Sequence, residues 1–204
     1  ASPRLLTLPQ ATVTPEELFE RARVFALPLR REFRGITVRE GLLFEGPSGW
    51  GEFAPFPDHT NEHASRWLEA ALEQAFGRWP TPVRDRIPVN AIIPAVDASV
   101  AAEWTEDALS RGCTTMKVKV GSSDFDADVQ RVAAVRGAMD AAGIEGCLRI
   151  DANGAWTARE AIDRIAVLDD IAMGLEYVEQ PVADRAELLQ VRRETTVQIG
   201  RAHV

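Results

Sequence analysis

Several features that define other protein classes are absent from this sequence of 204 residues. No apolar run approaches the ~18 to 20 residues that a membrane-spanning helix needs. The formal net charge is −8, so the chain lacks the basic surface on which nucleic-acid binding depends. Its first ten residues lack the basic and apolar blocks of a secretory signal. These absences predict a cytoplasmic protein that binds neither nucleic acid nor membrane.

Cysteine is scarce as well. The chain contains two cysteines, Cys113 and Cys147, and they do not stand in a CxxC spacing. Such a pair gives no support for a structural zinc site or a redox-active motif. We expect both to be small buried side chains of a protein in a reducing compartment.

Two regions of the chain differ in pattern. Residues 36–46 and 50–53 alternate in polarity around a Pro-Ser-Gly turn, which predicts an antiparallel hairpin. Residues 61–76 carry apolar side chains at helical spacing and are followed by glycine, which predicts a helix. The segment 79–88 contains three prolines and marks a boundary. We therefore expect a small α+β domain over residues 1–87.

After this boundary, strand-like and helix-like segments alternate. The third helix has a threonine, Thr157, in the position of an N-cap. Four successive strand–helix units with short connections are typical of a parallel sheet covered by helices. The predicted strands span residues 87–96, 114–120, 147–153 and 174–181, and the predicted helices span residues 98–112, 126–143, 157–170 and 184–194.

Parallel strand–helix repeats leave two α/β architectures, an open doubly wound sheet and a (β/α)8 barrel. A dinucleotide-binding sheet needs a glycine-rich turn after its first strand, but residues 90–99 contain no glycine, and no P-loop occurs. Polar side chains instead gather where the later strands end, which is the position of active sites in barrels. The sequence therefore favours a barrel, of which about half is present over residues 88–198.

Charged and amide side chains end three consecutive strands. They are Lys117 and Lys119, then Asp151 and Asn153, then Glu179. Because residues i and i+2 of a strand share a face, both lysines should face the barrel axis. Buried carboxylates need a cationic partner, so Asp151 and Glu179 predict a divalent metal held by oxygen, most simply Mg²⁺. Desolvation and mutual repulsion should lower the lysine pKa values, which makes a lysine a usable general base.

Each of these features has an ordinary explanation when taken alone. A lysine at a strand end usually forms a salt bridge or extends to solvent, and an Asp-x-Asn sequence commonly forms a turn. Their succession on three strands makes coincidence a poor explanation. A carboxylate-held cation beside a lysine suits removal of a proton next to a carboxylate group, with the metal stabilising the enediolate.

Three short motifs carry a resemblance to a known family. KVK at residues 117–119, DAN at 151–153 and EQP at 179–181 resemble the enolase superfamily, in its muconate-lactonizing subgroup. The longer segments 29–56 and 149–156 are similar to the actinobacterial type of o-succinylbenzoate synthase. The resemblance implies an enolase-like fold, in which an N-terminal α+β capping domain over residues 1–87 precedes a (β/α)8-type barrel.

The resemblance also implies a reaction, the Mg²⁺-dependent dehydration of 2-succinyl-6-hydroxy-2,4-cyclohexadiene-1-carboxylate to o-succinylbenzoate in menaquinone biosynthesis. By motif, Lys119 would be the general base and the acid that assists loss of hydroxide. Lys117 would position the carboxylate of this small-molecule substrate and lower the pKa of Lys119. Asp151 and Glu179 would bind Mg²⁺ or Mn²⁺, with Asn153 beside the site. The implied substrate contacts in the capping domain are Arg31, Phe33, Arg34 and Gly35.

Several alternatives stay open. N-acylamino acid racemases, dipeptide epimerases and muconate-type cycloisomerases share the same motifs, and a non-catalytic truncated module is a further possibility. The third carboxylate of the family, on strand five, and its sixth-strand lysine are missing from residues 1–204. With half a barrel and two carboxylates, we expect the chain expressed alone to be poorly soluble and inactive. The oligomeric state is not predicted.

The last six residues, IGRAHV, have an unusual match. They equal the in-frame translation of ATC GGA AGA GCA CAC GTC, a string found in a widely used sequencing adapter. We therefore predict that residues 199–204 are a non-native tail. A natural terminus is the alternative, and the genomic sequence would distinguish the two.

Overall fold

The computed structural model describes residues 13–33 and 35–200. The chain divides into two compact units, Ala1–Asp85 and Arg86–Val204. The division falls close to the boundary that the prolines predict. Each unit has a hydrophobic cluster of its own, as expected for two separate domains.

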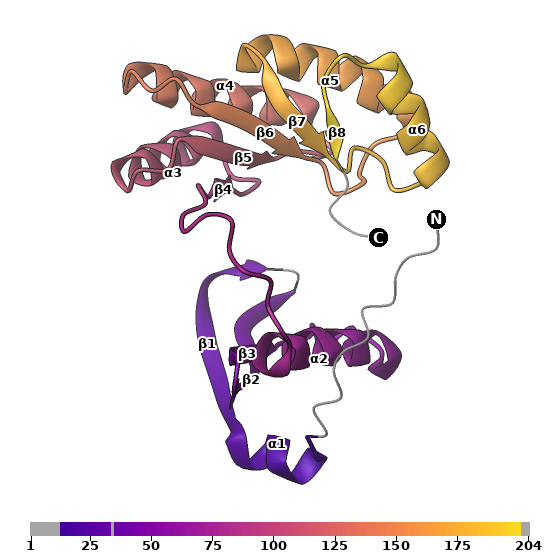
Figure 1. Ribbon diagram of the computed structural model, residues 1–204. Coiled ribbons are helices and arrows are strands. Elements are labelled where there is room, and N and C mark those ends of the chain that lie inside the picture. The colour runs from indigo at the N-terminus through magenta and orange to yellow at the C-terminus, as the bar shows by residue number, and fades with distance from the viewer. Residues whose placement is uncertain (1–12, 34, 201–204) are drawn as a thin grey trace. The chain divides into compact units, whose positions relative to one another are not determined.

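The N-terminal unit packs helices against an antiparallel sheet of three strands (Figure 1). Its larger helix contacts β3, and its buried cluster consists of Phe44, Ala71 and Ala75. The predicted hairpin and helix are confirmed, but the segment before the hairpin forms one long strand that the sequence did not suggest. The elements are α1 (Pro15–Arg21), β1 (Ala22–Phe33), β2 (Ile36–Gly46), β3 (Gly49–Phe53) and α2 (Asn61–Phe76).

The C-terminal unit is a parallel sheet of five strands, with helices in the connections (Figure 1). The strands lie side by side in chain order, so each strand–helix unit adds one strand to the same edge. The predicted alternation of strands and helices is confirmed. The strands are β4 (Ala91–Ile93), β5 (Thr115–Lys119), β6 (Cys147–Asp151), β7 (Leu175–Glu179) and β8 (Ile199–Gly200), and the helices are α3 (Ala98–Ser110), α4 (Phe125–Ala141), α5 (Ala158–Ala172) and α6 (Arg185–Glu194).

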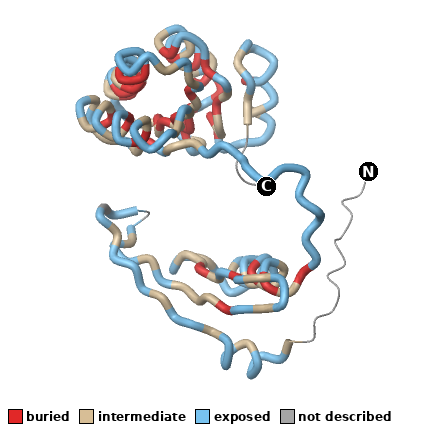
Figure 2. Tube along the Cα trace, turned by 60° about the vertical axis from the view of Figure 1, so that its left-hand side comes forward, coloured by how far each residue is buried: buried red, intermediate tan, exposed pale blue. Residues whose placement is uncertain are grey.

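The two faces of this sheet differ in character. On β5, Met116 and Val118 are fully buried and belong to one core cluster with Val132 and Val135 of α4. Figure 2 shows that buried residues are concentrated in these strands and helices. On the opposite face, Ile92 is 54% exposed, which leaves that face available for polar side chains. The sheet therefore has a helix-covered apolar face and an open face.

The expectation of buried cysteines is wrong for Cys147. This residue is exposed, and Cys113 is partly exposed. Cys147 is the first residue of β6, and Cys113 lies two residues before β5, where it packs against the core cluster.

Ile199 and Gly200, the described residues of the predicted non-native tail, continue the sheet. They pair in parallel with Val178 and Glu179 of β7. This pairing is a property of the backbone and leaves the origin of residues 199–204 a prediction.

Candidate active site

Three of the predicted site residues lie side by side where the parallel strands end. Lys119 of β5 pairs in register with Asp151 of β6, and Asp151 pairs with Glu179 of β7. Lys117 precedes Lys119 by one full pleat and therefore shares its face. The fold thus brings together four charged side chains from three strands, as the sequence predicts.

The ammonium groups contact the carboxylates directly. Lys117 Nζ donates a hydrogen bond to Glu179 Oε2 at 2.7 Å and lies 3.3 Å from Asp151 Oδ2. Lys119 Nζ donates to the same Asp151 Oδ2 at 2.6 Å. The Asp151 side chain is 2% exposed and that of Lys119 is 24% exposed. The carboxylate is therefore buried within the site, and the Lys119 side chain is more exposed than that of Lys117.

Asn153 both forms a turn and contacts the site, the two interpretations that the sequence left open. Its backbone N–H donates to Asp151 Oδ1 at 3.0 Å, and its φ of 50° belongs to a turn. Its side-chain Oδ1 also accepts a hydrogen bond from Lys119 Nζ at 2.8 Å. The Asp-x-Asn turn therefore places an amide oxygen directly on the Lys119 ammonium.

The charges of this cluster shift the pKa values of Lys117 and Asp151 in the direction opposite to that of burial. Burial by itself lowers the pKa of Lys117, but the hydrogen bond to Glu179 and the charges of Asp151 and Glu179 outweigh it and raise that pKa. The expectation of a lowered pKa is therefore wrong for Lys117, because carboxylates are its nearest neighbours. Burial likewise favours neutral Asp151, yet hydrogen bonds from Lys119 and Asn153 and the charges of both lysines lower the pKa of this carboxyl.

The carboxylates fit a hard divalent cation. The Lys117 ammonium lies within 3.3 Å of oxygens from both Asp151 and Glu179, so the two carboxylates already converge on a positive charge. Mg²⁺ is commonly held by one or two carboxylates and completes its shell with water and substrate oxygens. Among residues 13–33 and 35–200, no group of three or more His, Cys, Asp or Glu could hold a metal. Asp151 and Glu179 are thus the candidate protein ligands, without a third carboxylate in the described part.

A buried ion pair on α4 borders the site and was missed from the sequence. Asp128 and Arg131 are 0% and 4% exposed, and Arg131 Nη1 donates to the carbonyl oxygen of Lys119 at 3.1 Å. The sequence did contain a signal for this pair. Asp128 and Arg131 have the same helical spacing as Val132 and Val135, so two opposite charges stand within the apolar stripe of this helix.

A second unpredicted group lies on the open face, in register with Lys117 and one pleat before Asp151. Arg149 of β6 pairs in register with Lys117. It donates to Glu176 Oε2 at 2.5 Å and to Asn90 Oδ1 at 2.9 Å. Its guanidinium carbon lies 5.0 Å from the centre of the Tyr177 ring. The open face of the sheet is therefore polar over two successive layers.

The predicted substrate contacts of the N-terminal unit are only partly described. Phe33 is 56% exposed, and its ring centre lies 6.1 Å from that of Phe56. Gly35 has a φ of 76° in the turn between β1 and β2. Arg34 and the side chain of Arg31 lie outside the described part of the structure. Contact of these residues with substrate stays a prediction.

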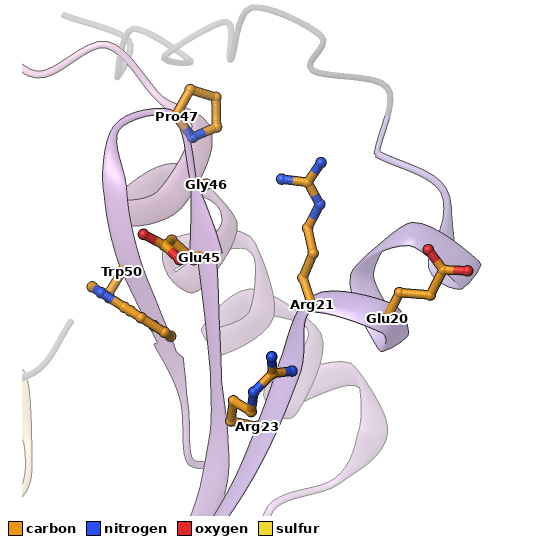
Figure 3. A pocket seen from close by; sticks show the side chains of 7 residues that line it. All are labelled: Glu20, Arg21, Arg23, Glu45, Gly46, Pro47 and Trp50. Atoms are coloured by element: carbon orange, nitrogen blue, oxygen red, sulfur yellow. The ribbon is translucent and has the colours of Figure 1, made fainter.

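The N-terminal unit also has a cavity of about 430 Å³ that contains none of the predicted residues. Figure 3 shows the side chains of Arg21 and Arg23 on one side and those of Glu45 and Trp50 on the other. Its charges are of both signs and do not repeat the lysine–carboxylate arrangement at the strand ends.

Comparison with known families identifies the fold. The sequence model described as enolase N-terminal domain-like matches residues 24–75, and the one described as enolase C-terminal domain-like matches residues 99–201. The chain therefore belongs to the enolase superfamily. Its fold is the α/β fold of that superfamily, with an N-terminal α+β domain followed by part of a (β/α)8-type barrel.

Individual relatives agree with this placement. The chain is 51% identical over 181 residues to an o-succinylbenzoate synthase of Thermobifida fusca, a match covering 87% of this chain and 54% of that protein. The chain thus spans about half the length of the curated relatives it matches. Residues 13–33 and 35–200 contain no helix long and apolar enough to cross a membrane.

Two solved structures resemble the fold. The L-Ala-D/L-Glu epimerase of Bacillus subtilis matches with a TM-score of 0.69 and 23% identity, over 88% of this chain and 66% of that one. The o-succinylbenzoate synthase of Thermosynechococcus elongatus, complexed with Mg in its active site, matches with a TM-score of 0.58 and 25% identity, over 88% of this chain and 67% of that one. Both likenesses support the enolase-like fold of this chain.

Proposed function

We propose that the protein to which this chain belongs is an o-succinylbenzoate synthase, a hydro-lyase that converts 2-succinyl-6-hydroxy-2,4-cyclohexadiene-1-carboxylate to o-succinylbenzoate and water. The observation that carries this proposal is the cluster of Lys117, Lys119, Asp151 and Glu179 at one end of the sheet. The 51% identity to the Thermobifida fusca enzyme supports this substrate over others that the fold could serve.

Lys119 is proposed as the group that moves the proton. Its side chain is the more exposed of the pair, at 24% against 15% for Lys117. In its neutral form it would take the proton from the ring carbon that bears the carboxylate. The C–O bond at the neighbouring carbon would then break, and the protonated Lys119 would return the proton to the departing hydroxide as water. One base thus serves both steps, which suits removal of both groups from one face of the ring.

The remaining residues bind and orient. Lys117 supplies positive charge for the substrate carboxylate and holds Glu179 through its 2.7 Å hydrogen bond. Asp151 and Glu179 would hold Mg²⁺, or Mn²⁺ in its place, and a bound metal would supply positive charge beside the same carboxylate. Asn153 fixes the orientation of Lys119 Nζ by accepting its hydrogen bond.

The test uses the protein encoded at the genomic locus of this chain, called here the locus protein. We expect Mg²⁺-dependent formation of o-succinylbenzoate, measured by absorbance, that is lost on chelation with EDTA. Lys119→Ala should lower kcat by on the order of 10² to 10⁴-fold, the usual contribution of a general acid–base group. Asp151→Ala should abolish Mg²⁺ binding in calorimetry, whereas Asp163→Ala, on the exposed surface of α5, should leave it unchanged.

Other outcomes would assign another function. Turnover of an N-acylamino acid or a dipeptide without o-succinylbenzoate formation would replace the proposal with a racemase or epimerase. Unchanged Mg²⁺ binding in Asp151→Ala would favour a non-catalytic module. The 204-residue chain expressed by itself should show no turnover, because its described residues supply two carboxylates.

A further inference from the structure

A buried ion pair lies beside the end of β5, next to the residues used in the proposed reaction. Arg131 Nη1 donates to Asp128 Oδ1 at 2.6 Å, and both side chains come from α4. Removing two charges from water is costly, and well-packed apolar residues often stabilise a core equally well. The remaining hydrogen bonds of the pair indicate what else it does.

Arg131 joins the end of β5 to the connection between β4 and α3. Its Nε donates to the carbonyl oxygen of Val96 at 2.6 Å, and its Nη1 donates to the carbonyl oxygen of Lys119 at 3.1 Å. The neighbouring strand β4 ends at Ile93, and the residue that follows, Pro94, has no N–H to offer. The Arg131 guanidinium therefore donates to the Lys119 carbonyl oxygen in place of a backbone N–H from a neighbouring strand.

Asp128 holds the turn that follows Lys119. Its Oδ2 accepts hydrogen bonds from the backbone N–H of Gly121 at 2.8 Å and of Ser122 at 3.1 Å. Its Oδ1 accepts from Ser122 Oγ at 2.9 Å. Every hydrogen bond between this ion pair and the rest of the unit thus goes to the segment after β4 or to residues 119–122.

The same turn is tied to β6 on its other side. Val120 N donates to the carbonyl oxygen of Asp151 at 3.0 Å. A Cβ at Gly121 would lie 2.8 Å from Ala155 Cβ and 2.9 Å from the carbonyl oxygen of Ala152. The backbone on either side of Lys119 is therefore held between α4 and the turn that carries Asp151.

We propose that Arg131 and Asp128 are positioning residues, which fix the backbone of Lys119 so that its Nζ is held against Asp151 and the substrate. The proposal rests on the assignment of Lys119 as the base. The physical reason is that the ion pair forms hydrogen bonds with the carbonyl oxygen of Lys119 and with the turn that follows it. The side chain of lysine is flexible and cannot by itself hold its backbone in place. Displacements of about 1 Å in such a group can cost about 10²-fold in rate.

The matched variants are Arg131→Met and Arg136→Met in the locus protein. Arg136 is also on α4 and has a side chain that is 12% exposed, but its ion pair goes to Asp140 at 2.7 Å and its hydrogen bond to the carbonyl oxygen of Ile144. Arg131→Met should lower kcat by on the order of 10 to 10²-fold, with KM for substrate and Mg²⁺ affinity within about twofold. Arg136→Met should lose stability without this loss of kcat.

Two conservative variants keep the proposal testable if Arg131→Met does not fold. Arg131→Lys keeps the charge but lacks the planar fork that reaches both carbonyls, so its kcat should lie between those of wild type and Arg131→Met. Asp128→Asn should also lower kcat at unchanged KM. A kcat within twofold of wild type in folded Arg131→Lys and Asp128→Asn, or equal losses in Arg136→Met, would overturn the proposal.

A measurement independent of turnover separates this proposal from the assignment of function. Isotope-labelled lysine restricts the NMR spectrum of the locus protein to its lysine side chains, and the signal that disappears in Lys119→Ala identifies Lys119. Arg131→Met should shift the Lys119 side-chain signals, and Arg136→Met should not. Unshifted Lys119 signals would refute positioning even if the wild type is an active synthase, and shifted signals without synthase activity would refute only the proposed function.

Discussion

Gly121 is the residue at which the backbone of the site is most constrained. Its φ of +97° is one that side chains rarely adopt, and atoms of Ala155 and Ala152 occupy the space where a Cβ would lie. The turn after β5 thus requires glycine for both conformation and space. The backbone of Lys119, two residues earlier, depends on this turn.

Gly121→Ala should therefore reduce stability by about 1 to 3 kcal/mol, the usual cost of a strained backbone, with a further loss from the clash. Gly112→Ala is the control, because Gly112 has a similar φ of +86° but no atom within 4 Å of its Cβ position. Urea unfolding of both variants measures the difference. Equal losses of stability would show that the space around Gly121 is less restricted than described.

The pKa of Lys117 is likewise set by the individual residues around it. The sequence places two lysines two positions apart, and that spacing alone predicts a lowered pKa. The structure adds Glu179 at 2.7 Å and Asp151 at 3.3 Å, and these raise the pKa of Lys117 instead. The residue identities and their common face were predictable, whereas the balance of charges depended on which atoms meet.

At the scale of elements, α5 begins with a complete capping box. Thr157 accepts a hydrogen bond from the backbone of Glu160, and the Glu160 carboxylate accepts from the backbone and hydroxyl of Thr157 at 3.0 and 2.9 Å. These bonds, together with the charge of Arg164, lower the pKa of Glu160. The N-cap at Thr157 was predicted from the sequence and is confirmed.

This pKa shift gives the helix a pH dependence. A carboxyl whose pKa is lowered on folding stabilises the folded state above its unfolded pKa, and the contribution is lost as pH falls through the folded pKa. Wild type should therefore have a higher Tm than Glu160→Gln at pH 7, and the difference should shrink below 4.5, the ordinary value. In a Thr157→Ala background part of this pH dependence should be lost, because the hydroxyl donor is removed while the backbone N–H of residue 157 still donates to Glu160. A pH-independent difference would contradict the role of the charge.

Helix α4 shows why one element was predicted and its function was not. Its apolar spacing was sufficient to place a helix near residues 126–143, and the structure has one at Phe125–Ala141. Asp128 and Arg131 interrupt the apolar stripe, but the sequence does not reveal that they bind the backbone around Lys119. That contact depends on how α4 packs beside β5.

At the scale of the whole molecule, the chain consists of two compact units, Ala1–Asp85 and Arg86–Val204. Residues 78–89 include the division between the two units, are exposed, and contain no helix or strand. Exposed irregular segments are preferred sites of proteolysis. This segment therefore offers a test of the division.

Limited digestion with trypsin should cut first within residues 78–89, which contain Arg78, Arg84 and Arg86. Mass spectrometry of the early products should show two fragments that meet in this segment. First cuts within the helices of the C-terminal unit would mean that the unit is less compact than its buried core indicates. Arg131→Met should be cut sooner than wild type after Lys119, because the turn that follows β5 loses a support.

The sequence by itself determined the alternation of strands and helices and the common face of Lys117 and Lys119, because these follow from periodicity, and its prolines predicted a boundary between two domains. Only the tertiary structure decided that Lys117 meets Glu179, 62 positions away, and that Lys119 meets Asp151, 32 positions away. It likewise decided that the pKa of Lys117 is raised and that Arg131 forms a hydrogen bond with the backbone of Lys119. Such effects depend on distances of a few ångströms between segments remote in the chain, and local sequence patterns do not encode those distances.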